Sequence, residues 1–279
     1  VTGTSLDASQ HPLYNNLVEF DLGKTTLHPS LAEKWTISAD GLTYRFYLRK
    51  NVKFHTTSFF TPKRQFNADD VLFTFNRQRL ESHPFHLVNG GTYEMFQAMV
   101  MEKSIKDIKK IDHYTVEFQL SRPEAPFLAN LAMGFASIMS EEYSTFLAQK
   151  NQKEKIDFEP IGTGPFRFIR YDKDTIIRYE KNPDYFGAPA KIDRLIFSIT
   201  ADPSVRYQKL KTGECHLITD PAPMDIPNMK KNPALTVMQQ EGLNVGYPAM
   251  NTEKESLKKP MVRQAIWHAL NRANYIKAI

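Results

Sequence analysis

The sequence of 279 residues predicts a mixed α/β fold in which helices and strands do not alternate strictly. Two patterns predict it: segments in which apolar and polar residues alternate, as in half-buried strands, and segments that begin at a helix-capping residue. The composition agrees, because 41% hydrophobic and 12% aromatic residues supply a sizeable core. At roughly 150 residues per domain, the length corresponds to about two domains. No stretch is apolar enough to predict a transmembrane helix.

The strand pattern is clearest at Thr43–Leu48, where Tyr44, Phe46 and Leu48 fall on one face and Arg45 on the other. The same alternation, or a shorter run of strand-forming residues, predicts further strands at Val116–Leu120, Phe166–Tyr171, Thr175–Tyr179, Leu195–Ile199, Leu235–Gln239 and Asn244–Met250.

The helices are predicted from their capping residues. Asn67 can cap a helix over Ala68–Leu80, and Ser140 can cap Glu141–Gln149. Asp202 precedes a proline at the first helical position of the next helix, which Gly213 ends. Less regular patterns predict helices at Glu94–Val100, at Pro123–Leu131 and, in two pieces, over Pro260–Ile279.

Turn residues cluster at two candidate boundaries. In Pro160–Pro165, two glycines lie between two prolines, and we expect these glycines to permit sharp backbone dihedrals. The second boundary lies near Glu241–Asn244, between two predicted strands.

The charge pattern argues against nucleic-acid binding. The chain has 36 basic and 31 acidic residues, a net charge of +5, and the two signs are interleaved. The densest basic groups, Lys103–Lys110 and Lys254–Lys259, are interpreted as solvated faces. A single cysteine, Cys215, cannot form an internal disulfide and is interpreted as a small core residue.

No catalytic or metal-binding constellation is present in the sequence. The motifs of serine hydrolases, zinc proteases and nucleotide-binding loops are all missing. The neighbouring Asp69 and Asp70 are interpreted as helix N-terminal acids rather than as a catalytic pair. Met95, Met99 and Met101 are interpreted as core residues. The sequence therefore predicts no catalytic residue, no metal site and no cofactor, and we expect a protein that is not an enzyme.

Several segments together resemble the peptide-type solute-binding proteins of ABC importers, the bacterial extracellular solute-binding family 5. They follow one another in the family's order and spacing and cover nearly the whole chain. These segments are Leu31–Trp35, Ser38–Gly41, Tyr44–Arg49, Val52–His55, Asn67–Val71, Arg122–Phe127, Pro160–Phe166, Arg206–Leu210, Gly242–Tyr247 and Val262–Ala265. Within the family, the dipeptide-binding branch and the haem- and glutathione-binding branch are most similar.

The resemblance implies a two-lobed periplasmic-binding-protein fold of type II, of which this chain supplies mainly the first lobe. It places residues 1–29 and 161–241 in a sheet-bearing subdomain of that lobe. Residues 30–160 are expected to form a smaller inserted subdomain. Residues 242–279 are expected to be the truncated start of the second lobe, with a hinge crossing near Glu241–Asn244.

The resemblance also implies where a ligand binds. The family's main ligand-pairing residues lie in the second lobe, outside these 279 residues. Gly3, Thr4 and Ser5 align with a loop that lines the cleft, where backbone amides and a hydroxyl would bond a peptide main chain. Tyr93, at the end of a glycine-rich loop, is the second candidate, since an aromatic hydroxyl suits a cleft edge.

The function implied is capture of dipeptides or other small peptides between two closing lobes and delivery to an ABC permease in the inner membrane. The protein would be a periplasmic monomer, with or without a lipid anchor. A haem- or glutathione-binding lipoprotein on the same scaffold is the alternative. From other classes, an α/β hydrolase lacks a visible nucleophile–base pair, and nucleic-acid binding would be strongly weakened by salt.

Overall fold

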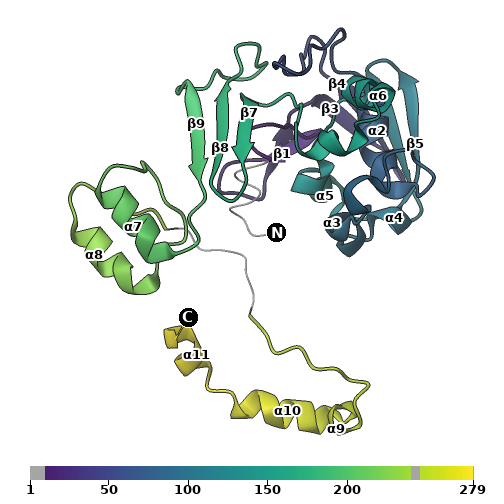
Figure 1. The fold of residues 1–279 in the computed structure, drawn as a ribbon. Helices are drawn as coiled ribbons and strands as arrows, with labels where there is room; N and C mark the ends of the chain where they lie inside the picture. The colour runs from purple at the N-terminus through teal and green to yellow at the C-terminus, as the bar shows by residue number, and fades with distance from the viewer. Residues whose placement is uncertain (1–9, 240–245, 279) are drawn as a thin grey trace. The chain divides into compact units, whose positions relative to one another are not determined.

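A computed structural model of the chain describes residues 10–239 and 246–278 (Figure 1). The chain divides into two compact units, Val1–Thr200 and Ala201–Ile279. Within the described ranges the first unit holds every strand, and the second unit consists of helices and connecting segments. The mixture of helices and sheets confirms the predicted fold class.

The first unit contains a four-stranded antiparallel sheet in the order β3-β4-β6-β5. Its strands are β3 (Ala32–Ile37), β4 (Thr43–Leu48), β5 (Ile105–Asp112) and β6 (Thr115–Leu120). In β4, Tyr44, Phe46 and Leu48 are buried while Arg45 is exposed, which confirms the predicted alternation. Phe46 meets Phe118 of β6 edge to face, with ring centroids 5.6 Å apart. Such cross-strand aromatic pairs fix the register of the sheet.

A three-stranded antiparallel sheet has the order β7-β8-β9, and a short hairpin-like pair joins β1 to β2. Their bounds are β1 (Val18–Phe20), β2 (Leu27–Pro29), β7 (Phe166–Asp172), β8 (Ile176–Lys181) and β9 (Arg194–Ser198). The strands predicted around residues 166–171, 175–179 and 195–199 are confirmed to within two residues.

The predicted helix caps of the first unit are also confirmed. The Asn67 side chain accepts from the Asp69 amide at the start of α2, and Ser140 accepts from the Tyr143 amide at the start of α6. Helices α2 and α6 pack against each other, and α2 also packs on β5 and β6 (Figure 1). The helical elements of this unit are α2 (Ala68–Arg79), η1 (Val88–Gly90), α3 (Glu94–Ala98), α4 (Met101–Ser104), α5 (Phe127–Leu131), η2 (Gly134–Ala136), α6 (Glu141–Gln149) and η3 (Lys153–Asp157).

The first unit has two hydrophobic cores. The larger one surrounds the four-stranded sheet and takes apolar residues from α2, α5 and α6. The smaller one joins Leu13 to Phe168 and Tyr179 on the three-stranded sheet. The division into residues 1–29 with 161–241, 30–160 and 242–279 stays a prediction.

The second unit contains α7 (Pro203–Lys211), η4 (Pro223–Asp225), α8 (Ile226–Lys231), α9 (Glu255–Lys258), α10 (Pro260–Ala269) and α11 (Arg272–Ala278). The predicted start of α7 at Asp202 and its end at a left-handed Gly213 are confirmed. Cys215 is only partly buried, so its interpretation as a core residue is wrong.

Two predicted strands of the second unit are wrong in the part that the structure describes. Leu235–Gln239 and residues 246–250 are not strands, and residues 244–245 lie outside the described ranges. The alternating pattern is present, but no neighbouring segment of the described second unit offers a hydrogen-bonding partner. An extended segment becomes a stable strand only when it has such a partner.

Candidate ligand cavity

The first unit contains a cavity of about 840 Å³. Its wall is built from segments far apart in sequence: the segment before β1, the second half of α2, the stretch from η1 to α3, the region of η2, the end of η3, and the strands β7 and β8. Most of the side chains that face it are aliphatic or aromatic. Concave sites of this size and lining are typical of small-molecule binding.

One side of the cavity belongs to the smaller core. Leu13, Tyr14, Phe168 and Tyr179 all line it, and Phe168 and Tyr179 meet edge to face with centroids 6.2 Å apart. Burial raises the pKa of Tyr179, and burial together with the nearby Asp157 carboxylate raises the pKa of Tyr14. Both phenols therefore stay uncharged throughout the physiological pH range. This side of the wall is apolar and electrically neutral.

An ion pair between a buried arginine and an exposed aspartate also lines the cavity. Arg77 of α2 donates from Nη2 to Asp157 Oδ2 at 3.0 Å and from Nη1 to Oδ1 at 3.2 Å, and its Nε donates to the Phe85 carbonyl oxygen. Burial alone would lower the pKa of Arg77, but the Asp157 carboxylate outweighs it and raises that pKa. Asp157 also accepts from Asn89 Nδ2 at 2.6 Å. The two charges therefore compensate each other inside the wall.

The glycine-rich loop before α3 brings Tyr93, one of the predicted site residues, to the cavity. Asn89, Gly90 and Gly91 all have positive φ, which glycine adopts freely and asparagine tolerates. The loop then returns so that the Tyr93 hydroxyl donates to the His86 carbonyl oxygen at 2.9 Å. Tyr93 lines the cavity and is partly buried, and burial raises its pKa. A contact between Tyr93 and a ligand stays a prediction. Because the hydroxyl already donates to His86, the ring is the part of the side chain that we expect to make this contact.

The other predicted site residues, Gly3, Thr4 and Ser5, lie outside the described residues. Gln10, at the start of the described range, lines the cavity. The role of Gly3, Thr4 and Ser5 in ligand binding stays a prediction.

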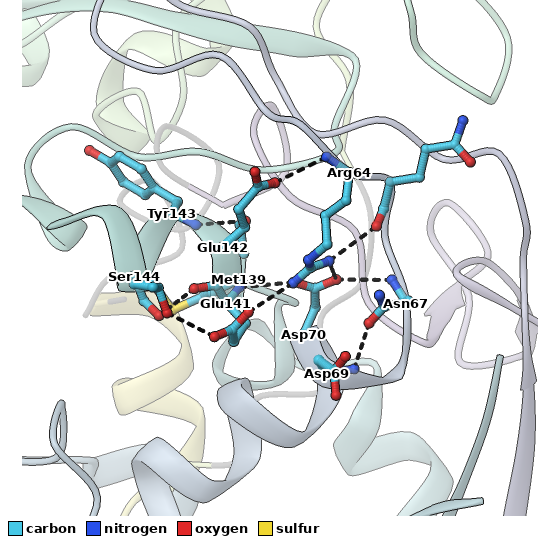
Figure 2. Close-up of polar contacts among 12 residues, drawn as sticks. Arg64, Asn67, Asp69, Asp70, Met139, Glu141, Glu142, Tyr143 and Ser144 are labelled. Atoms are coloured by element: carbon cyan, nitrogen blue, oxygen red, sulfur yellow. Dashed lines mark hydrogen bonds and ion pairs between the residues drawn. The ribbon is translucent and has the colours of Figure 1, made fainter. Parts of the chain in front are cut away.

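The N-terminus of α2 is anchored by a buried carboxylate (Figure 2). Asp70 is 0% exposed and accepts from Arg64 through both oxygens at 2.8 Å. It also accepts from the backbone amides of Asn67 at 2.9 Å and Glu141 at 2.8 Å. The first of these bonds completes a capping box, and the second joins α2 to the start of α6. Asp69 points away and pairs with Lys110 at 2.8 Å, so the interpretation of both acids as helix N-terminal acids is confirmed.

The anchored helix carries three residues of the cavity wall: Thr74, Arg77 and Gln78. The Thr74 hydroxyl donates to the Asp70 carbonyl oxygen and accepts from the Met139 amide at 2.9 Å. Gln78 Nε2 donates to the Phe135 carbonyl oxygen at 2.8 Å. These bonds attach the segment around η2 to α2.

A second buried junction holds Leu13 and Tyr14 against the cavity. The backbone of Leu13 lies so close to the glycine loop that a Cβ added at Gly162 would be 1.9 Å from the Leu13 carbonyl oxygen. Gly164 donates its amide to the same oxygen at 2.8 Å. Neither glycine has a positive φ in the structure. The prediction that they permit sharp dihedrals is therefore wrong: they are required because two backbones approach closely.

His55 completes this junction. Its Nδ1 accepts from the Gly162 amide at 3.2 Å, which assigns the proton to Nε2, and Nε2 donates to the Gly164 carbonyl oxygen at 2.9 Å. Burial lowers the pKa of the His55 imidazole to about 4. The histidine is therefore a neutral structural group that joins the segment after β4 to the glycine loop.

Sequence reasoning missed most of this wall. Arg77 and Asp157 lie 80 positions apart, and no local pattern relates them. Met95 is 43% exposed and lines the cavity, so its interpretation as a core residue is wrong, whereas Met101 is buried as expected. The glycine-rich loop that precedes Tyr93 was the local signal for this part of the wall.

Over 10–239 and 246–278, no group of three or more His, Cys, Asp or Glu residues is placed to hold a metal ion. Within the same ranges, no helix combines the length and the apolar character that crossing a membrane requires.

The sequence matches the profile described as bacterial extracellular solute-binding proteins, family 5 middle, over residues 26–279. It is 50% identical over 278 residues to the dipeptide-binding protein of Escherichia coli and 45% identical over 279 residues to heme-binding protein A of Haemophilus influenzae. Each alignment covers the whole of this chain. The chain spans about half the length of these relatives, 52% and 51% respectively.

The fold is similar to that of a solved dipeptide-binding protein from Pseudoalteromonas sp. SM9913 in complex with Met-Leu. The TM-score is 0.92 and the sequence identity 36%, and the match covers all of this chain and 55% of that one. The architecture is therefore that of a type II periplasmic binding protein, of which the chain corresponds to about half.

Proposed function

Because the chain belongs to the bacterial extracellular solute-binding proteins of family 5, we propose that it is part of a binding protein for dipeptides or similar small peptides. The observation that carries the proposal is the 50% identity to a dipeptide-binding protein, which extends over the whole chain. The cavity of about 840 Å³ supports it, since pockets for small ligands have volumes of about 300–1,000 Å³.

The proposed mechanism is capture and release rather than catalysis. The first lobe supplies a wall that is already shaped, and the second lobe, which residues 242–279 begin, closes on the ligand by a hinge motion. The closed, monomeric protein then docks on an ABC permease in the inner membrane. It works in the periplasm, free or lipid-anchored.

The cavity wall has few uncompensated charges that could discriminate between peptides of different sequence. Its Arg77–Asp157 pair is internally compensated, and its phenols remain neutral. Contacts to main-chain groups, which all peptides share, would then give affinity for many sequences. Gly3, Thr4 and Ser5 are proposed to make such main-chain contacts, and the ring of Tyr93 is proposed to lie along the ligand.

Haem or glutathione is the second candidate, favoured by the 45% identity to a heme-binding protein. Haem iron is held in proteins by histidine, cysteine, methionine or tyrosine. The described residues that line the cavity include Met95, Met139 and Tyr171 but no histidine or cysteine. The lining therefore does not separate the two candidates, and the higher sequence identity to a dipeptide-binding protein favours a peptide.

The test is calorimetric titration of the protein encoded by the complete gene, first with a mixed set of dipeptides and then with glutathione and haem. Saturable heat with dipeptides is the expected result. Heat only with glutathione or haem would replace the proposal by the second candidate. If none of the three ligands gives heat of binding, both candidate functions are overturned.

A further inference from the structure

The sequence contains a single Asn-Gly pair, and both of its residues, Asn89 and Gly90, lie in η1. In such a pair, the backbone nitrogen of the glycine can attack the side-chain amide carbon of the asparagine before it. Glycine favours this attack because it has no Cβ to obstruct it. Asparagine is accordingly one of the residue types that proteins working at high temperature use sparingly. The pair is therefore a candidate site of chemical modification.

The structure leaves this pair accessible to water. Asn89 and Gly90 are both exposed, and no atom of the described residues lies within 4 Å of a Cβ added at Gly90. The Gly90 amide donates to the Leu87 carbonyl oxygen at 3.3 Å, which is longer than the ordinary distance of about 2.9–3.0 Å. The attacking nitrogen is thus weakly bonded, and there is space around it for a new ring.

The side chain of Asn89 ties η1 to η3 through two hydrogen bonds. Its Nδ2 atom donates to Asp157 Oδ2 at 2.6 Å and to the Glu154 carbonyl oxygen at 2.9 Å. Both bonds lie at the exposed surface, where water competes for them and releases the side chain for part of the time. Both bonds also need Nδ2 as a donor, and a carboxylate at the same place could make neither.

A carboxylate at position 89 would also change the charge of the cavity wall. Asp157 already pairs with Arg77, and the Asn89 amide donates to it from 2.6 Å. Conversion of this amide to a carboxylate would place two negative groups side by side with one guanidinium to share. Like charges at such a distance repel each other. The wall would gain one uncompensated negative charge, and η1 would lose both ties to η3.

We propose that Asn89 is a site of spontaneous deamidation and that its product opens the contact between η1 and η3. The Gly90 amide loses its proton to hydroxide, and its nitrogen forms a bond to Asn89 Cγ. The bond from Cγ to Nδ2 breaks, and Nδ2 leaves as ammonia with a proton taken from water. Water then opens the cyclic imide at either carbonyl group, which gives aspartate or isoaspartate. Water is the only co-reactant, and nothing is oxidised or reduced.

Two other asparagines of the same chain serve as internal controls. Asn51 and Asn151 are exposed and have positive φ like Asn89, but Val52 and Gln152 follow them. The protein encoded by the complete gene is incubated at mildly alkaline pH and digested with chymotrypsin. Mass spectrometry then follows the replacement of NH₂ by OH in each peptide. We expect Asn89 to react about tenfold faster than either control, or more. A rate at Asn89 no higher than at the controls would overturn the proposal.

Two variants separate the reaction from its consequence. Asn89→Gln keeps an amide but would have to close a larger ring, so the rapid modification should disappear. Asn89→Asp carries the product's charge from the start and should lower the urea midpoint at pH 7.5 by about 0.5 M. This loss should shrink toward pH 4, where protonation of one carboxyl group supplies an O–H donor to the other. Asn151→Asp is the matched control at an exposed position outside this contact.

Equal midpoints for Asn89→Asp and the original protein at pH 7.5 would overturn the proposed opening of the contact. Persistence of the rapid modification in Asn89→Gln would show that the reacting residue is not Asn89. All these measurements are made without a ligand. Their outcome is therefore independent of whether the protein binds peptides.

Discussion

The Nε2 atom of His55 lies 2.9 Å from the carbonyl oxygen of Gly164, and both residues are buried. Burial lowers the pKa of His55 to about 4, whereas an unfolded histidine has a pKa of about 6.5. As the pH falls, the unfolded state therefore binds this proton first. The full stability is present above pH 6.5 and is lost progressively as the pH falls toward 4. The loss amounts to about 3 kcal/mol of unfolding free energy.

Urea unfolding between pH 7.5 and 4 measures this dependence. The variant His55→Gln should be less stable at pH 7.5 and should lack this part of the pH dependence. His113→Gln, at an exposed position, should keep the slope of the original protein. An unchanged slope in His55→Gln would show that other groups cause the acid sensitivity.

Gly162→Ala tests the close approach of two backbones. The added Cβ would lie 1.9 Å from the Leu13 carbonyl oxygen, so one backbone must move. We expect a loss of about 3 kcal/mol in unfolding free energy, together with weaker dipeptide binding because Leu13 and Tyr14 line the cavity. Gly246→Ala is the control: it has a negative or extended φ and nothing within 4 Å of its added Cβ. Similar stabilities of the two variants in thermal and urea unfolding would contradict the prediction.

Asp70→Asn and Asp69→Asn are neighbouring substitutions that we expect to lower the free energy of unfolding by different amounts. Asp70 is buried with Arg64, so its replacement removes the partner of a partly buried guanidinium and should cost about 3 kcal/mol. Asp69 pairs with Lys110 at the surface, and its replacement should cost less than about 1 kcal/mol. Equilibrium urea unfolding of both variants at neutral pH measures the two losses of unfolding free energy. Equal costs would mean that the Asp70 anchor contributes no more than a surface ion pair.

Two substitutions at Tyr93 distinguish whether its ring or its hydroxyl would contact a ligand. The hydroxyl donates to the His86 carbonyl oxygen, so Tyr93→Phe should lower stability by about 1 kcal/mol and change dipeptide affinity less than twofold. Tyr93→Ala removes the ring from the cavity wall and should weaken binding about tenfold. Titration of both variants with the tightest dipeptide measures the difference. A tenfold loss in Tyr93→Phe would instead identify the hydroxyl as the contact.

Local patterns predicted most of the secondary structure. The caps at Asn67, Ser140 and Asp202 were correct because each acts within three residues of chain. The alternation in Thr43–Leu48 was correct because one face of the sheet is buried. The strand predicted at Leu235–Gln239 failed because pairing depends on a second segment, and alternation says nothing about whether that segment is present.

The cavity was less predictable because its wall is assembled from distant segments. The glycine-rich loop made Tyr93 a candidate, but Arg77 and Asp157 become neighbours only when α2 and η3 are packed. The glycines at 162 and 164 were recognised as special for a different physical reason from the one that the structure shows. A close backbone approach involves a partner at Leu13, about 150 positions earlier, which no sequence window contains.

Helix α2 has 12 residues, so its axis is about 18 Å long. Asp70 fixes one end through backbone amides, and Arg77 lies in the cavity wall near the other end. The wall is thus preorganised: its side chains lose little conformational entropy when a ligand arrives. A ligand that fits this shape would therefore be expected to bind without the free-energy cost of moving α2.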